Sequence, residues 1–447
     1  MKIAISILKY FPHGGLQRDF MRIAEEANRR GHSVTVYTTA WNGERPDWMN
    51  VQFLNPFAFT NHRKAVLFHK ALHRELKKDP CDVLLGMCRG NGLDFYFSGD
   101  DCFALNQQKK HSALFCKLSP RIRTFMEMER AIFAPESKTK ILHLVEQQKK
   151  QFTEFYHTPD ERQYIVPPGM NPDCKYPEDA PAQRAAFRDK LGIAEDRLVL
   201  LCVGANLKLK GADRAIQAVN ALPKQLREKI TLLLVGNKTR ELETLAQGVA
   251  ADIRFEGVSE HVLDYYLAAD LMVHPARSEA AGNVLIEALS CGLPVICTGL
   301  CGFSTYVQEA GAGHVLYGEL HQGELNAAVE SLLADREHLK YLGQEALDYT
   351  QHTNLTGRAS VIVDLLEEYH GIRRTLPAVL PRLVSERCFY SGLCNRWRSF
   401  PQHQKPENNA FFCRKRILLY QNPPCDRMER DLQESSHVQK TGSRCRK

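Results

Sequence analysis

The chain has 447 residues, enough for two domains that each bury a core. Its 44% hydrophobic and 25% charged residues are typical of a globular protein and exclude a disordered or fibrous chain. No apolar run reaches the roughly 18 residues that a membrane span needs. The net charge of +7 comes from residues 375–447, which hold 14 Lys and Arg against 6 Asp and Glu. The rest of the chain is nearly balanced, so we expect no nucleic acid as a partner.

Fourteen cysteines are spread along the chain, and no two of them lie three residues apart. The C-x-x-C motif of metal and redox sites is therefore absent. The first segment, Lys2–Leu8, is apolar but is followed at once by Lys9 and Pro12, which predicts a strand and not a signal peptide. Scattered thiols without a secretory signal indicate a reducing compartment, and we expect a cytoplasmic protein.

The first half of the chain alternates short apolar runs with helical patterns, which predicts a parallel sheet covered by helices. After Lys2–Leu8, a loop with Gly14 and Gly15 leads into an amphipathic helix over Leu16–Arg30, and a second strand follows at Ser33–Thr38. Further strands are predicted at Val83–Met87, Leu93–Phe97, Lys140–Val145 and Gln163–Val166.

The second half repeats this pattern after a polar, proline-bearing stretch that opens at Pro167 and marks the domain boundary. Strands are predicted at Leu198–Gly204, Thr231–Val235, Ile253–Phe255, Leu271–His274 and Val295–Cys297, and helices at Ala212–Leu222, Val262–Ala269, Ala281–Cys291 and Glu324–Leu333. We therefore predict an α/β fold of two doubly wound Rossmann-like domains facing across a cleft, with ligands at the carboxyl ends of the strands. The domains are expected at residues 1–168 and 169–352, with a helix over 353–371 that packs back on the first.

The stretch after the fourth predicted strand of the second half carries two carboxylates eight residues apart, Glu279 and Glu287. Helical spacing places Glu279 just before a helix and Glu287 two turns inside it. The helix start at Gly282, Asn283 and Val284 offers free N–H groups and the positive end of the helix dipole, which suit a phosphate. The two glutamates would then hold hydroxyls at either end of a diphosphate, as in a nucleotide-sugar site. A capped helix with a solvated face is the alternative.

Three further positions point to the same site. Gly15 lies between the first strand and its helix, where a doubly wound domain lets its backbone approach a phosphate. Lys210 lies in the corresponding loop of the second domain and would neutralise a leaving diphosphate; the alternative is that Lys208 and Lys210 are solvated loop charges. Asp100 and Asp101 end another strand, where a catalytic role and a helix cap both remain open.

Missing motifs narrow the class of protein. Gly-x-Gly-x-x-Gly is absent, which argues against a nicotinamide oxidoreductase. No two aspartates lie two residues apart, so there is no D-x-D metal motif, and we expect a metal-independent transferase whose only co-substrate is a nucleotide sugar. A glycogen-type phosphorylase would share the architecture but would need a lysine Schiff base with pyridoxal phosphate. A non-enzymatic polyanion-binding protein would rest on the basic tail alone.

Several segments resemble one family closely. The segments Lys9–Ala24, Gly92–Tyr96, Pro167–Gly169, Glu279–Pro294 and Cys301–Tyr306 are similar to lipopolysaccharide core glucosyltransferase I. The resemblance covers about residues 1–370. The two glutamates match the E-x7-E signature of retaining glycosyltransferases of family 4, which have the GT-B fold.

The resemblance implies transfer of glucose from UDP-glucose to a heptose of the lipopolysaccharide inner core, with retention of the α configuration, on the cytoplasmic face of the inner membrane. It implies a site made of Gly15, Asp19, Asp100, Lys210, Glu279 and Glu287. In this interpretation Glu287 binds the ribose, Glu279 orients the donor sugar, Lys210 neutralises the diphosphate and Asp100 positions the sugar or the acceptor. Front-face attack and double displacement through a carboxylate both remain open.

The sequence departs from this family at two positions. Cys174 and Val258 stand where the relatives carry arginine, the second alignment being uncertain by about one residue. Both changes would thin the cationic lining around the nucleotide. A changed donor, weak donor affinity or a degenerate enzyme are therefore open alternatives.

The segment 103–133 combines basic and apolar side chains in a helix-prone stretch. Its basic residues are Lys109, Lys110, Lys117, Arg121, Arg123 and Arg130, interleaved with Leu114, Phe115, Leu118, Ile122, Phe125 and Ile132. This pattern predicts an interfacial helix that docks on the anionic inner leaflet. An amphipathic helix over the core is the alternative.

The last part of the chain, residues 375–447, has a different composition from the rest. It contains 5 of the 14 cysteines, repeated prolines and one short apolar run, Lys415–Tyr420, which is too little to bury a core. We predict a disordered basic tail that is not needed for catalysis. Added affinity for anionic lipid or lipopolysaccharide is the functional alternative.

Overall fold

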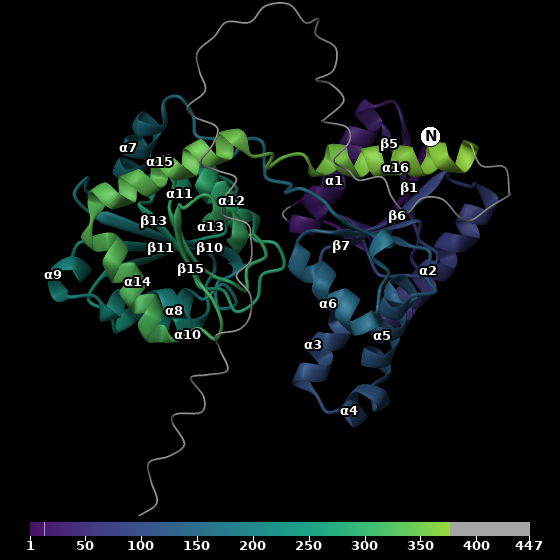
Figure 1. Cartoon of the computed structure of the whole chain (residues 1–447), viewed down its shortest axis with the longest axis horizontal. Coiled ribbons are helices and arrows are strands. Elements are labelled where there is room, and N and C mark those ends of the chain that lie inside the picture. Colours follow the sequence, from purple (N-terminus) through teal and green to yellow (C-terminus); the bar gives the residue numbers. More distant parts are fainter. Residues whose placement is uncertain (13, 376–447) are drawn as a thin grey trace, which may run out of the picture. The chain divides into compact units, whose positions relative to one another are not determined.

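The computed structural model of the chain describes residues 1–12 and 14–375. The prediction of a disordered tail over 375–447 therefore lies, apart from Thr375, outside the described residues. Two sheets of parallel strands organise the described part, each with helices on both faces (Figure 1). The doubly wound α/β architecture predicted from the sequence is confirmed.

The first sheet has seven strands in the order β5-β3-β1-β6-β7-β8-β9, all parallel. These strands are β1 (Lys2–Ser6), β3 (Ser33–Thr38), β5 (Met49–Phe53), β6 (Val83–Gly86), β7 (Phe95–Ser98), β8 (Lys140–His143) and β9 (Gln163–Ile165). A separate short pair joins β2 (Lys9–Tyr10) to β4 (Ala40–Trp41). The inner strands β1, β6 and β7 are almost continuously buried because helices cover both faces of the sheet.

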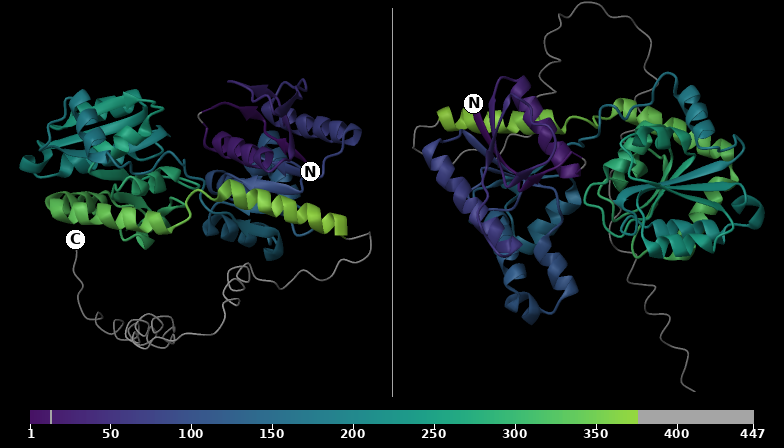
Figure 2. Two further views of the ribbon diagram at one scale, coloured as in Figure 1. Left: turned by 90° about the horizontal axis from the view of Figure 1, so that it is seen from above. Right: turned by 180° about the vertical axis from the view of Figure 1, so that it is seen from behind.

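Side chains that alternate along each strand enter two separate cores. Ile3 and Ile5 of β1 pack under α1 and α16, whereas Ala4 faces the core under α2, α5 and α6. The helices of this domain are α1 (Gly15–Arg29), α2 (Asn61–Lys78), α3 (Phe103–Lys110), α4 (Ala113–Leu118), α5 (Pro120–Phe133), α6 (Glu146–Tyr156) and α16 (Arg358–Thr375), with a 3₁₀ turn at Asp160–Arg162. The last helix, α16, runs beside α1 although more than 300 residues separate them, as Figure 2 shows.

The second sheet has six parallel strands in the order β12-β11-β10-β13-β14-β15. They are β10 (Leu198–Asn206), β11 (Ile230–Asn237), β12 (Asp252–Gly257), β13 (Leu271–His274), β14 (Val295–Thr298) and β15 (Gly313–Leu316). Helices α8, α10 and α14 cover one face, and α7, α11, α12, α13 and α15 cover the other. Their bounds are α7 (Ala180–Lys190), α8 (Ala212–Ala221), α9 (Lys224–Arg227), α10 (Arg240–Gln247), α11 (Val262–Ala268), α12 (Asn283–Ser290), α13 (Ser304–Glu309), α14 (Gln322–Ala334) and α15 (Arg336–His352).

The predicted strands agree with the observed ones to within a few residues, and the differences lie in helices and short edge elements. No separate element is predicted from the sequence for the strands β2, β4, β5 and β15 or for the helices α2, α6, α7, α9, α10, α13 and α15. The helix expected over 353–371 starts instead at Arg358, because residues 353–357 form a non-helical connection after α15. No helix in the described part of the chain is both long and apolar enough to cross a membrane.

Candidate active site

The carboxyl ends of parallel strands lie at one edge of each sheet, and the loops that leave this edge carry the candidate residues. In the second sheet, β10 leads to the loop with Lys210, and β13 leads to the loop with Glu279. The two strands are neighbours. The topology therefore brings Lys210 and Glu279, which are 69 residues apart, into direct contact.

Glu279 is largely buried and sits between two basic groups. Lys210 Nζ donates to Glu279 Oε2. His274 Nε2 lies 3.6 Å from the same oxygen. Burial would raise the pKa of Glu279, but His274 and Lys210 outweigh this effect and hold the pKa below its ordinary value. The carboxylate is thus kept ionised in a site where an unpaired charge would be costly.

The path of the Lys210 side chain depends on the glycine that precedes it in β10. A Cβ at Gly204 would lie 2.6 Å from Lys210 Cγ. A Cβ at Gly211, which has φ +83°, would lie 2.2 Å from the carbonyl oxygen of Pro275. Gly204 therefore leaves room for the Lys210 side chain, and Gly211 lets the loops after β10 and β13 approach closely. The neighbouring Lys208 is different, since it pairs with Asp213 and Glu241 at 2.9 and 2.6 Å.

Helix α12 begins directly after Gly282, which has φ +94° and is the N-cap residue. The first residues of the helix, Asn283 and Val284, place backbone N–H groups at its free end. The amide oxygen of Asn283 is buried and has no hydrogen-bond partner. The first N–H groups of α12 have no partner within the helix, and a Cβ at Gly282 would lie 3.1 Å from Glu279 Cγ, so these donors lie next to Glu279.

Glu287 lies in the middle of α12 and is buried. Tyr266, from α11, donates its hydroxyl to Glu287 Oε2 at 3.0 Å. Burial raises the pKa of Glu287, and Arg18, the Tyr266 hydrogen bond and Arg22 only partly offset it. This carboxylate has one protein donor and can accept further hydrogen bonds from a ligand.

Gly15 is the first residue of α1, and a Cβ there would meet nothing within 4 Å. The preceding Gly14 differs, because a Cβ there would lie 1.9 Å from Gln17 Oε1. Gly14 is therefore needed for packing, while Gly15 borders open space at the carboxyl edge of the first sheet. This is the position at which a ligand could approach the backbone.

Asp19 is buried in α1 and is bound by the protein itself. Arg358 Nη1 donates to both carboxylate oxygens of Asp19 at 2.8 Å. The same guanidinium donates from Nε to the carbonyl oxygen of Pro167. Arg22, one turn along α1, donates to the carbonyl oxygens of Gly169 and Met170. Asp19 therefore belongs to a network that ties α1 to α16 and to the connection between the two sheets.

Asp100 and Asp101 follow β7 and do not cap the next helix through their side chains. The first N–H groups of α3, on Phe103 and Ala104, bond instead to the buried carboxylate of Glu129 at 2.8 and 2.9 Å. Asp100 is 77% exposed, with Arg89 Nη1 at 3.7 Å. Burial, together with Asp100 and Glu279, raises the pKa of Asp101. The exposed carboxylate of Asp100 therefore stays available to a ligand.

The two positions that depart from the family have different surroundings. Cys174 is buried, and burial raises the pKa of its thiol to about 12. Arg18 and Arg22 act on both Cys174 and Glu287, so α1 supplies positive charge at this point. Val258 is 65% exposed.

Sequence reasoning missed three residues that the structure brings to the site: His274, Tyr266 and Arg22. His274 ends the strand before the Glu279 loop, and this position could have identified it as a site residue from the sequence. Tyr266 and Arg22 reach Glu287 only through the packing of α11 and α1, and no local pattern marks them. Within the described ranges, no cluster of three or more His, Cys, Asp and Glu side chains could hold a metal ion.

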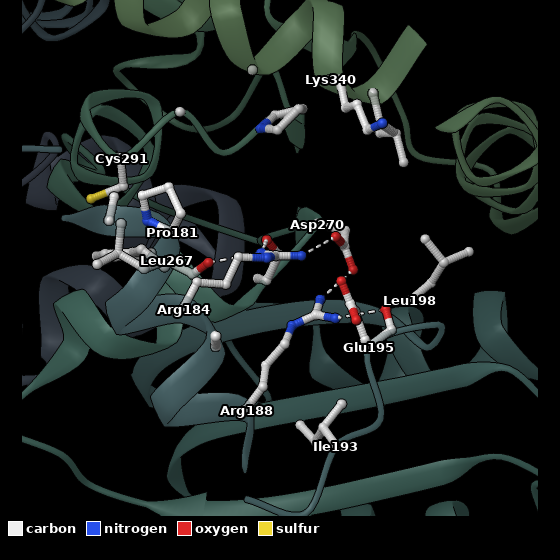
Figure 3. A pocket seen from close by; sticks show the side chains of 18 of the residues that line it. Pro181, Arg184, Arg188, Ile193, Glu195, Leu198, Leu267, Asp270, Cys291 and Lys340 are labelled. Carbon is white, nitrogen blue, oxygen red and sulfur yellow. Dashed lines mark hydrogen bonds and ion pairs between the residues drawn. The ribbon is translucent and has the colours of Figure 1, made fainter. Parts of the chain in front are cut away.

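A pocket of about 1160 Å³ lies elsewhere, on the face of the second sheet between α7 and α15 (Figure 3). The charged side chains Arg184, Arg188 and Asp270 in this pocket are bound by other groups of the protein. Arg184 donates to the carbonyl oxygens of Leu267 and Ala269, and Arg184 and Arg188 both bind Asp270, at 2.5 and 2.7 Å. These bonds hold the C-terminal end of α11 in place. Tyr266 also lines the pocket, but none of the site residues predicted from the sequence does.

Comparison with known proteins defines the class. Residues 183–348 match the family described as glycosyl transferases group 1. The crystal structure of Anabaena HepE in complex with UDP-glucose, at 16% identity, covers 82% of this chain and 100% of that chain with a TM-score of 0.62, which shows a shared fold. The chain is a glycosyltransferase with the GT-B fold.

Two further relatives define the family. The lipopolysaccharide glucosyltransferase WaaG of Escherichia coli K12 is 37% identical over 369 residues, which cover 82% of this chain and 98% of that protein. The crystal structure of WaaG, a glycosyltransferase involved in lipopolysaccharide biosynthesis, covers 81% of this chain and 99% of that chain with a TM-score of 0.76. The chain belongs to the WaaG family, the lipopolysaccharide core glucosyltransferases I, as the sequence motifs predicted.

Proposed function

We propose that this protein transfers glucose from UDP-glucose to a heptose of the lipopolysaccharide inner core and retains the α configuration. One observation carries this proposal: Lys210 and Glu279 meet at the N-terminus of α12, where N–H groups are free to bind a diphosphate. The name of the 37% identical relative supports the acceptor class and the transferred sugar.

In the proposed complex, UDP-glucose binds at the carboxyl edge of the second sheet. Glu287 accepts hydrogen bonds from the ribose diol with the carboxylate capacity that Tyr266 leaves unused. Lys210 and the N–H groups near Gly282, Asn283 and Val284 neutralise charge as the diphosphate leaves. Glu279 orients the hydroxyls of the glucose.

The first domain supplies the acceptor side. Asp100, exposed at the end of β7, positions the sugar or the acceptor hydroxyl. Gly15 leaves room for the ligand beside the start of α1. Asp19 acts indirectly, because its carboxylate is held by Arg358 and fixes the helix that carries Gly15.

Retention is compatible with two routes. In front-face attack, the leaving phosphate takes the proton of the acceptor hydroxyl while the new bond forms on the same face. In double displacement, a carboxylate would first bond to the anomeric carbon. Glu279 pairs with Lys210 and faces His274, which suits a group that orients the sugar. We therefore favour front-face attack.

We propose that the enzyme needs no cofactor and no metal ion. The sequence has no D-x-D motif, and Lys210 with the α12 N–H groups can provide the counter-charge that a divalent ion supplies in other transferases. Activity should therefore persist in EDTA. Activity that is lost in EDTA and restored by Mn²⁺ would contradict this part of the proposal.

We further propose that residues 103–133 dock the enzyme on the anionic inner leaflet of the cytoplasmic membrane. Three helices occupy this segment, and their apolar residues divide into two groups. Ile122 and Ile132 are buried against the domain, whereas Leu114, Phe115 and Leu118 of α4 are 67%, 51% and 69% exposed. The exposed lysines around α4 add attraction to anionic lipid. Docking would bring the site to an acceptor that is anchored in lipid.

Another donor is the alternative that a specific observation favours. Cys174, which replaces the arginine of the relatives, lies near Glu287, so the lining around the nucleotide differs.

Anomeric NMR of the product formed from UDP-glucose and heptose-terminated lipopolysaccharide tests the main proposal. An α-linked glucosyl product is expected. A β-linked product would contradict retention, and an absent product would shift the choice to another donor or acceptor.

A further inference from the structure

A buried histidine next to Glu279 has no hydrogen-bond partner. His274 is fully buried at the end of β13, and neither Nδ1 nor Nε2 makes a hydrogen bond. An unpartnered polar group in a protein interior has lost its bonds to water without replacing them, which destabilises the fold. Such a group needs an explanation, because an apolar side chain of similar size would avoid this cost.

A second buried histidine at the end of a strand, His143, does have a hydrogen-bond partner. His143 is likewise the fully buried last residue of its strand, β8 of the first sheet. Its Nε2 lies 2.9 Å from Gln163 Oε1, at hydrogen-bond distance. The imidazole at the end of β13 faces Glu279 instead, at 3.6 Å, which is just beyond hydrogen-bond range.

We propose that His274 is a positioning residue that holds Glu279 in place when Lys210 turns to the diphosphate. This inference rests on the proposed function, in which Lys210 serves the leaving group. Lys210 and His274 approach the same oxygen, Oε2, from different strands. When the ammonium moves to the phosphates, the buried carboxylate keeps one donor, the Nε2–H of His274.

Only a small movement is required. The backbone of Glu279 is fixed, because it pairs with Cys301 and its carbonyl oxygen accepts from the N–H of Gly302 at 3.1 Å. A side-chain shift of roughly 0.5 Å brings Nε2 and Oε2 within hydrogen-bond distance. The carboxylate then keeps its orientation towards the donor sugar while Lys210 neutralises the diphosphate.

The groups around His274 allow this exchange. Cys301 and Glu279 face the imidazole from the loop after β14 and the loop after β13. Lys210, from the loop after β10, reaches Glu279 and not the ring. The other ring nitrogen, Nδ1, stays without a partner in the structure, so no second bond restrains the imidazole.

Two variants separate this role from simple packing. His274→Leu removes the donor, and we expect kcat to fall about 10- to 100-fold, as for lost transition-state donors of moderate strength. The Kd of UDP should stay within about twofold, because UDP lacks the donor glucose that Glu279 orients. Tm should stay equal or rise, since leucine removes an unsatisfied polar group. His274→Gln restores an N–H donor and should recover most of the kcat.

His143→Leu is the matched control. It leaves Gln163 without its buried partner, so it should lower Tm and leave kcat close to the wild-type value. A His274→Leu variant that keeps the wild-type kcat would overturn the proposal. So would a variant that loses UDP affinity and Tm together with kcat, because that pattern indicates a structural role.

A measurement without turnover distinguishes failure of this inference from failure of the proposed function. In Lys210→Met, Glu279 has lost its ammonium, and ¹⁵N NMR should show His274 Nε2 as a protonated, hydrogen-bonded nitrogen. The signal should vanish in the double variant Lys210→Met/Glu279→Ala. An unchanged His274 ring spectrum in Lys210→Met would contradict the exchange, whichever nucleotide sugar the enzyme uses.

Discussion

The two sheets present their candidate carboxylates in opposite ways. In the second domain, Glu279 and Glu287 are held by groups of the same domain, Lys210 and Tyr266. In the first domain, Asp19 is fully occupied by Arg358, and Asp100 is largely exposed to solvent. The carboxylates of the second domain are therefore held in place without a ligand, whereas the first domain keeps the exposed carboxylate of Asp100. In the proposed function, the donor side is organised before binding, and Asp100 remains for the acceptor.

The largest effect is expected where a carboxylate is already used by the protein. Asp19→Asn breaks a buried ion pair and leaves the Arg358 guanidinium without its counter-charge, which should cost about 3–5 kcal/mol of unfolding free energy. Guanidinium denaturation measures this loss. The control is Asp79→Asn, which removes the exposed pair with Lys2 and should change the unfolding free energy far less, because solvent screens this pair. Equal stability of the Asp19 variant and the wild type would show that Asp19 is free for substrate.

The second largest effect is expected at the contact that organises the donor side. Lys210→Met should lower kcat about 10²- to 10³-fold, because it removes the cation that faces the leaving diphosphate. Lys208→Met is the matched control, since Lys208 lies two residues away and pairs only with Asp213 and Glu241. Steady-state kinetics of both variants measure the two values of kcat. If Lys208→Met lowered kcat more than Lys210→Met, then Lys208 and not Lys210 would be the lysine that faces the diphosphate.

Glu287 offers a test in which stability and binding move in opposite directions. Glu287→Gln should weaken binding of UDP-glucose about 10-fold or more, because charged hydrogen bonds contribute about 1.5–3 kcal/mol. The same change should raise Tm at pH 7, by roughly 2–4 °C for each kcal/mol gained.

The sign follows from the raised pKa of Glu287, which burial causes. The fold favours the protonated form, so stability from this group is present at low pH and is lost as the pH rises through the raised pKa. The gain in Tm should therefore vanish below about pH 4. Calorimetry across the pH range checks this. A gain that persists at low pH would assign the effect to packing.

A smaller effect is expected on membrane binding. Leu114→Ser/Phe115→Ser removes two exposed apolar side chains from α4 and should lower partitioning into anionic vesicles about 10-fold. The matched control is Phe57→Ser/Phe59→Ser, which changes two other exposed aromatics outside the segment 103–133. Co-sedimentation at two salt concentrations measures both. An equal loss in the control would mean that the segment has no special role.

The smallest effect is expected at Asp100. Because the side chain is exposed and its contact with Arg89 is long, Asp100→Asn should reduce transfer to acceptor by about fivefold or less. UDP binding should not change. Isothermal titration with UDP and transfer assays with acceptor separate the two quantities. A large loss of UDP affinity would place Asp100 on the donor side instead.

The candidate residues of the two domains differ in how well the sequence alone predicts their contacts. Glu279, Glu287 and Lys210 could be identified from the sequence because each lies in the loop or helix that directly follows a predicted strand. Local chain geometry therefore determines where they lie. Arg358, which holds Asp19 from 339 residues away, could not be found in this way, because only the docking of α16 on α1 brings the two together.

Burial explains the remaining differences. Segment 103–133 has one amphipathic composition, but the structure divides it into three helices and buries Glu129, which binds the start of α3. A sequence pattern cannot separate the apolar residues that cover the domain from those that stay exposed. His274 illustrates the same limit, since its place at the end of a strand was predictable and its missing partner was not.

The most direct test of the proposed donor is a competition assay. Equal concentrations of UDP-glucose, UDP-galactose, ADP-glucose and GDP-mannose are incubated with heptose-terminated lipopolysaccharide in EDTA, and each released nucleotide is quantified. UDP is expected, with consumption of UDP-glucose alone and only when acceptor is present. Preferential consumption of another nucleotide sugar, or nucleotide release that does not depend on the acceptor, would contradict the assignment of this chain as a UDP-glucose-dependent core glucosyltransferase.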